Sequence, residues 1–433
     1  MPRHSSRDRV EQTLARIADP NGEGARVFLT TYADAARASA DAADERARSV
    51  RALGPLDGAI ISIKDLFDVA DEVTRAGSKV LAAEGKRAAA DAPVVARLRA
   101  AGAVIVGKTN MTEFAFSGIG LNPHFGTPGN PADRARIPGG STSGGAVAVA
   151  DGMGEIAIGT DTGGSTRIPA ALCGITGFKP SKHRVPTEGA FPLSFTLDSV
   201  GPMGRSVADC AVADAVMAGE APRPPESIMI SGLRLGLAQG MPVDGLDATV
   251  AAAYERAVAQ LGKAGAAVTA QALPLLDDMA RVNARGGIIA PEALSIHRER
   301  LDARGDMVDP NVRFRIERAR TALAADYIAM LRERDALLRA MDAHLENIDA
   351  LVMPTVPIAA PRMDEVTTAE AFAAKNAQVL RNTAIVNFFS LCAISLPLPR
   401  DSGLPVGLML IARNGDDRRL LTIAAAVEQL LAV

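Results

Sequence analysis

The chain has 433 residues, of which 48% are hydrophobic and 22% charged, so it can bury a sizeable core and is not mainly disordered. Its 47 basic and 50 acidic residues give a net charge of −3, and only 3% of the residues are aromatic. This composition argues against a nucleic-acid-binding protein, because neither a basic surface nor base-stacking side chains are available.

The N-terminal residues 1–55 are predicted to form a helical segment, in which Val10, Leu14 and Ile17 recur at helical spacing. No apolar stretch follows the charged start of the chain, so it does not match a secretory signal. No apolar run approaches the roughly 18 residues that a membrane span needs. The 3 isolated cysteines are typical of reduced thiols. We therefore expect a cytoplasmic protein with no membrane partner.

Strands and helices alternate in the next part of the chain. Residues 58–63 form a short apolar run, which predicts a buried strand ending at Lys64. Residues 91–102 predict a helix, with proline at its start and glycine at its end, and residues 103–106 predict another buried strand. This order of elements is typical of an α/β protein.

The second half of the chain changes in character. Residues from about 245 to 350 are charged and helical in pattern, so we expect a helical covering region there. The last helix is predicted at about 417–431. Glycine is concentrated earlier, since residues 101–204 hold 20 of the 39 glycines. Glycine is needed where the backbone turns sharply or approaches a ligand closely, so the chemistry is expected in that glycine-rich part.

Three segments combine small residues with groups that can react: 62–65 (SIKD), 138–145 (PGGSTSGG) and 159–169 (GTDTGGSTRIP). In the third segment, Ser165 follows two glycines after an apolar stretch, which predicts a tight turn with exposed backbone N–H groups. Such amides stabilise an oxyanion, and the serine could attack a carbonyl. Taken alone, the segment fits a phosphate-binding or structural turn equally well.

A serine nucleophile needs a base. The 5 histidines are isolated, and His124 and His183, which lie in the glycine-rich part, also fit as polar loop residues. Lys64 is the better candidate because only 8 of the 47 basic residues are lysines and because a buried lysine, unlike an arginine, can lose its proton. Ser141 and Ser143 precede a run of small residues, where they would either relay a proton or cap a helix.

Together the three segments resemble the amidase signature family, whose members hydrolyse amides with a Ser–cis-Ser–Lys triad. Residues 139–144 are similar to the family's first glycine–serine stretch and residues 163–167 to its second. The resemblance implies that Ser165 is the nucleophile, Ser141 the bridging serine and Lys64 the base. It also implies an oxyanion hole formed by the backbone amides of the residues Thr162, Gly163, Gly164 and Ser165.

Further segments extend the resemblance from about residue 10 to the end of the chain. It implies one catalytic domain over residues 1–433, an α/β fold with a mixed, largely parallel sheet covered by helices. Supporting roles are expected for Ser143, Asp161 and Arg167. Arg167 either braces Asp161 and the turn or binds an anionic substrate itself, and bracing is favoured. Thr142 and Thr166 depart from the family pattern, outside the triad.

The substrate pocket is only weakly predicted, with Met111 and Phe114 as candidate binding residues and further walls from 191–197 and 280–330. Residues 152–157 match a dinucleotide-binding pattern, but they precede a strand instead of following one, so this match is rejected. No metal-binding motif is present, and we expect neither a metal nor a cofactor. Cys173 is expected to be a buried structural thiol.

The predicted function is hydrolysis of a small-molecule carboxylic amide to an acid and ammonia or an amine through an acyl-enzyme. Two alternatives stay open. One is the glutaminase component of a tRNA-dependent amidotransferase complex, although no additional docking segment is apparent, and the other is a catalytically silent binding protein on the same scaffold. Assembly into a homo-oligomer is also left open.

Overall fold

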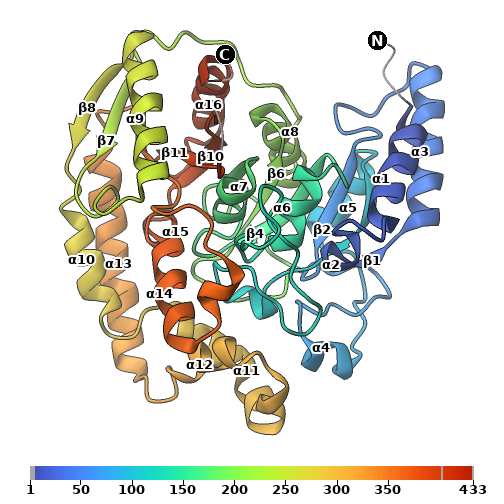
Figure 1. The fold of residues 1–433 in the computed structure, drawn as a ribbon, viewed down its shortest axis with the longest axis horizontal. Coiled ribbons are helices and arrows are strands. Elements are labelled where there is room, and N and C mark those ends of the chain that lie inside the picture. Colours follow the sequence, from blue (N-terminus) through green and yellow to red (C-terminus); the bar gives the residue numbers. More distant parts are fainter. Residues whose placement is uncertain (1–4, 401–402, 432–433) are drawn as a thin grey trace.

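A single mixed sheet with helices around it forms the core of the computed structural model, which describes residues 5–400 and 403–431 (Figure 1). In the described residues the sheet has 11 strands in the order β1-β3-β2-β4-β6-β5-β10-β11-β9-β7-β8. The strands are β1 Phe28–Thr31, β2 Ile60–Lys64, β3 Val104–Thr109, β4 Ile156–Asp161, β5 Thr176–Lys179, β6 Ser199–Gly204, β7 Arg234–Ala238, β8 Ala267–Gln271, β9 Ala350–Pro354, β10 Cys392–Pro397 and β11 Gly407–Ala412.

Helices cover the sheet and close its ends. In Figure 1 the early helices α1 and α3 lie beside β1, while α9, α10 and α13 lie at the opposite end near β7 and β8. The helices are α1 Ser6–Ala18, α2 Gly24–Val27, α3 Ala33–Arg48, α4 Lys79–Glu84, α5 Pro93–Ala100, η1 Glu113–Ala115, α6 Ser143–Ala150, α7 Arg167–Cys173, α8 Val207–Ala218, α9 Ala248–Lys263, α10 Leu275–Asn283, α11 Ile289–Arg304, η2 Gly305–Met307, α12 Pro310–Glu317, α13 Ala324–His344, η3 Met363–Val366, α14 Ala369–Leu380, α15 Thr383–Phe388 and α16 Asp417–Leu431. None of these helices is long and apolar enough to span a membrane.

The expected mixed sheet covered by helices is confirmed. Parallel pairing is confined to two parts of the sheet, β3-β2-β4 and β9-β7-β8. The centre and the β1 edge are antiparallel, so that within the described residues six pairings between neighbouring strands are antiparallel and four are parallel. The C-terminal strands add to the antiparallel pairings, because β10 pairs antiparallel with both β11 and β5.

Several elements match their predicted positions, namely β2, α5, β3 and α16. Two predicted helical regions need correction. Residues 1–55 contain β1, which pairs antiparallel with β3 at the sheet edge. The covering region from about 245 to 350 contains β8, which pairs parallel with β7 after the crossover helix α9. Both strands have only four or five residues, and the helices around them dominate the local pattern.

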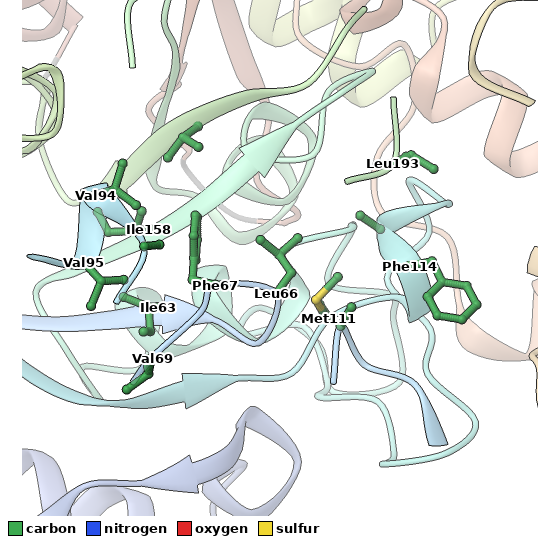
Figure 2. Packing of buried hydrophobic residues seen from close by; sticks show 14 of the residues in the cluster. Ile63, Leu66, Phe67, Val69, Val94, Val95, Met111, Phe114, Ile158 and Leu193 are labelled. Atoms are coloured by element: carbon green, nitrogen blue, oxygen red, sulfur yellow. The ribbon is translucent and has the colours of Figure 1, made fainter. Parts of the chain in front are cut away.

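The site-bearing strands β2 and β4 are anchored by a buried apolar cluster. Figure 2 shows Ile63 of β2 and Ile158 of β4 packed with Phe67 and with Val94 and Val95 of α5. Ile63 is also aligned with Ile158 in the parallel register of these two strands. Because parallel strands end at the same edge of a sheet, the carboxyl ends of β2 and β4 are placed side by side.

Candidate active site

A buried lysine and a serine meet at the end of β2. Lys64 is the last residue of β2, and its Nζ donates hydrogen bonds to Ser141 Oγ at 2.8 Å and to Thr160 Oγ1 at 3.0 Å. Ser141 follows a cis peptide bond from Gly140. The side chains of Lys64 and Ser141 are fully buried, so the contact is shielded from bulk water.

Burial changes the acid–base character of this lysine. Removal from water disfavours the ammonium form and lowers the pKa of Lys64 to about 7, although the negative charges of Asp161 and Asp198 act in the opposite direction. A substantial fraction of Lys64 is therefore neutral near neutral pH. A neutral lysine in contact with a hydroxyl can accept its proton.

Ser165 lies next to this pair through the backbone. The N–H of Thr142, the residue after Ser141, donates to the Ser165 carbonyl oxygen at 3.3 Å. Ser165 is 5% exposed, whereas Ser141 is fully buried. In the part of the chain that the structure describes, the Ser165 hydroxyl makes no hydrogen bond, including none to Ser141. The structure thus joins Lys64 and Ser141 directly and leaves the Ser165 hydroxyl free.

The turn before Ser165 presents unused backbone amides. Within residues 5–400 and 403–431, the N–H groups of the four residues Thr162 to Ser165 donate no hydrogen bond. Gly164 has a φ of +138°, and a Cβ there would lie 2.2 Å from Thr383 Oγ1. Thr383 Oγ1 in turn donates to the Gly163 carbonyl oxygen at 2.6 Å. The turn therefore requires glycine and is held from the α15 side, which leaves its amides free for an oxyanion.

A buried ion pair supports the turn from behind. Arg167 donates from Nη2 to Asp161 Oδ1 at 2.8 Å and from Nε to Asp161 Oδ2 at 3.0 Å, and both side chains are fully buried. Asn387 Nδ2 also donates to Asp161 Oδ1, at 2.8 Å. Burial by itself would raise the pKa of Asp161, but the charge and hydrogen bonds of Arg167 hold it well below its usual range. Arg167 therefore braces Asp161, and its guanidinium is occupied.

The buried ion pair between Arg167 and Asp161 is expected to stabilise the fold. Arg167→Met leaves the Asp161 carboxylate buried without its cation, so we expect a loss of about 3–5 kcal/mol in the free energy of unfolding at pH 7. Urea unfolding measures this loss. Arg48→Met is the matched control, because Arg48 pairs with Glu45 on the exposed surface and its loss is expected to have little effect. Equal stability of the Arg167 variant and the wild type would contradict the bracing role.

Other candidate residues occupy structural positions. His124 Nε2 lies 3.0 Å from Glu113 Oε2, and His183 lies in a loop with a φ of +70°. Cys173 Sγ donates to the Pro138 carbonyl oxygen at 3.3 Å, and burial raises the pKa of its thiol. Ser143 is the first residue of α6, and its buried hydroxyl has no partner in the described chain. No group of His, Cys, Asp and Glu able to hold a metal ion occurs among the described residues.

The substrate pocket differs from the expectation in detail. Met111 and Phe114 are buried in the apolar core, and Figure 2 shows both within that cluster. A cavity of about 250 Å³ borders the free amides of the turn instead. Met111 and Phe114 do not line it, because their side chains pack inward against the core. Its lining residues are Phe116, Thr162, Gly163, Leu197, Met279, Asn283, Gly286, Gly287, Ile288, Ile289, Ala290, Arg315, Arg318, Ala384, Asn387 and Phe388.

Sequence reasoning missed two side chains at this site. Thr160 accepts a hydrogen bond from Lys64. It could have been found from the sequence, because it lies on β4 two residues beyond Ile158, which is aligned with Ile63 of β2. Arg315 on α12 lies within the predicted wall 280–330 and lines the cavity, but it was not singled out, because charged residues alternate with apolar ones around it, as on an exposed helix.

Comparisons with known proteins agree over nearly the whole chain. The sequence profile of the family described as Amidase matches residues 8–421. The chain is 37% identical to 2-amino-5-chloromuconic acid deaminase of Comamonas testosteroni, over 92% of this chain and 86% of that protein. It is 36% identical to a component of the glutamyl-tRNA(Gln) amidotransferase of Chloroflexus aurantiacus, over 97% of this chain and 92% of that protein. A solved structure described as an amidase has a TM-score of 0.87 and 33% identity, covering 99% of this chain and 97% of that one.

Proposed function

The chain belongs to the Amidase family and is an amide C–N hydrolase, and from that premise we propose that it cleaves small-molecule amides through Ser165, Ser141 and Lys64. The observation that carries this proposal is the buried hydrogen bond of 2.8 Å between Lys64 Nζ and Ser141 Oγ. Burial provides a lysine that is partly neutral near pH 7, and Thr142, the residue after Ser141, binds the backbone of Ser165.

The reaction proceeds in two stages. Neutral Lys64 takes the proton of Ser141 while Ser141 takes the proton of Ser165, whose oxygen attacks the amide carbon. The carbonyl oxygen becomes an oxyanion, which the free amides between Thr162 and Ser165 stabilise. The proton on Lys64 returns through Ser141 to the leaving nitrogen, the C–N bond breaks, and an acyl-enzyme forms on Ser165. Water then attacks this ester by the same relay and releases the acid.

The pH dependence tests the lysine base. Only neutral Lys64 can accept a proton, so the rate is expected to fall about tenfold per pH unit below about 7 and to level off above it. The measurement is the rate at which a fluorophosphonate labels Ser165 between pH 5 and 9, which requires no knowledge of the substrate. A rate that stays flat across this range would contradict Lys64 as the base.

The glutaminase alternative rests on the similarity to components of glutamyl-tRNA(Gln) amidotransferases. A stand-alone amidase is the main proposal. The chain is 37% identical to the Comamonas deaminase as well, and the name of that enzyme gives a small carboxylic acid as its substrate. Ammonia release from a panel of amides separates the two, since a glutaminase is expected to prefer L-glutamine. A cytoplasmic location stays a prediction, and the oligomeric state stays open.

A further inference from the structure

The cavity beside the free amides has one positively charged wall. It has a volume of about 250 Å³ and touches Thr162 and Gly163, so a substrate whose carbonyl reaches these amides extends into it. Apolar side chains such as Leu197 and Ile288 form much of its lining. Its polar lining residues are neutral except on the α12 side, where two arginines, Arg315 and Arg318, face the same space.

Arg315 is held without an anionic partner. Its Nε is buried and makes no hydrogen bond, and no ion pair of Arg315 or Arg318 exists among the described residues. The guanidinium carbon of Arg315 lies 4.4 Å from the ring centroid of Phe116, which also lines the cavity. Stacking on this ring leaves the N–H edge of the guanidinium free, and that edge matches a carboxylate in a bidentate arrangement.

The charge of Arg315 persists at neutral pH. Burial, together with the neighbouring charge of Arg318, lowers the pKa of Arg315 to about 10, which is still well above 7. Arg315 is part-buried, and its Nε is buried without a partner, so a bound anion would relieve the cost of removing this group from water. Arg167, the other arginine near the turn, is already occupied by Asp161.

The cavity lacks acidic residues as well. No Asp or Glu belongs to its lining within the described part of the chain, so nothing there balances a positive charge on a ligand. An ammonium group in this space would meet two guanidiniums and no carboxylate. The lining therefore favours a ligand that carries a negative charge and no positive one.

We propose that Arg315, assisted by Arg318, binds a carboxylate on the acyl part of the substrate, so that the substrates are monoamides of dicarboxylic acids without an ammonium group. This inference rests on the proposed amide hydrolysis at Ser165 and adds its substrate class. It also separates the enzyme from a glutaminase, because L-glutamine is glutaramate with an additional α-ammonium group. Arg315 acts as a specificity-determining residue and takes no part in the proton relay.

The test uses matched amides that differ in a single group. Succinamate, glutaramate and adipamate carry the carboxylate, butyramide, valeramide and hexanamide replace it by a methyl group, and L-glutamine adds the ammonium. We expect wild-type kcat/KM to be highest for a carboxylate-bearing amide, by about 100-fold over its neutral counterpart and over L-glutamine. Ammonia release measures all seven compounds.

Two arginine variants test whether Arg315 causes the preference for carboxylate-bearing amides. Arg315→Met keeps the side-chain volume and is expected to lower kcat/KM for the anionic amides by about 100-fold, mainly through KM, while the neutral amides are unchanged. Arg313→Met is the matched control on the same helix, because Arg313 pairs with Glu317 at 3.2 Å and does not line the cavity. It is expected to behave like the wild type.

Fluorophosphonate labelling distinguishes the two possible failures. An unlabelled wild type would overturn the proposed function itself. A labelled wild type whose Arg315→Met variant hydrolyses the anionic amides at the wild-type kcat/KM would overturn only the carboxylate inference. The inference would also be overturned if L-glutamine were preferred to glutaramate, or if no carboxylate-bearing amide were hydrolysed or slowed the labelling.

Discussion

Ser165→Ala is expected to reduce amide hydrolysis by at least about 10³-fold, because the attacking oxygen is removed and no acyl-enzyme can form. The fold should be unaffected, since the Ser165 hydroxyl makes no hydrogen bond within the described residues and the change removes one atom. Ammonia release measures the activity, and urea unfolding measures the stability.

Ser39→Ala is the control for this prediction. Ser39 lies on α3 with an exposed side chain, outside the cavity and outside the Lys64–Ser141 contact. We expect the Ser39 variant to retain the activity. Full activity in Ser165→Ala would show that the nucleophile is another residue.

Lys64→Ala is expected to abolish turnover to a similar extent, because Ser141 then has no base to take its proton. The alanine variant also leaves a cavity and two unpaired hydroxyls, on Ser141 and Thr160. Lys64→Met fills the space of the lysine stem and separates loss of the base from loss of packing. Both variants are expected to be inactive, with the methionine variant closer to wild-type stability.

The lysine prediction has a clear contrary outcome. If Lys64→Met were folded and hydrolysed amides at the wild-type rate, Lys64 would be a structural residue. Ser141→Ala completes the series, since interrupting the relay should also greatly reduce the rate. If the three residues form one relay, combining Ser165→Ala with Lys64→Met should cost little more than either change alone.

Local sequence pattern was sufficient for the strand that ends at Lys64 and for the helix over residues 417–431, because each is long or apolar enough to dominate its own window. It was insufficient for β1 and β8, whose few residues lie between helices. Strand direction was also beyond local pattern. Residues near 393–395 pair with residues 177–179, and such distant contacts depend on the whole chain.

Some residues of the candidate site could be predicted from the sequence and others could not. Lys64 and Ser141 are 77 positions apart, yet both were predictable because each lies in a distinctive motif that the family resemblance links. Arg315 was not predictable, because its importance depends on what the fold places around it: Phe116 beneath it and no carboxylate lining its cavity. Met111 and Phe114 were expected at the substrate, but their apolar side chains are packed in the core.

The most direct test of the proton relay is the intact mass of the protein after reaction with a fluorophosphonate, followed by peptide mapping. A single adduct on Ser165 in the wild type, with none in Lys64→Met, is the expected result, because only the relay activates that hydroxyl. No adduct at pH 8, or an adduct that maps to another residue, would contradict the account.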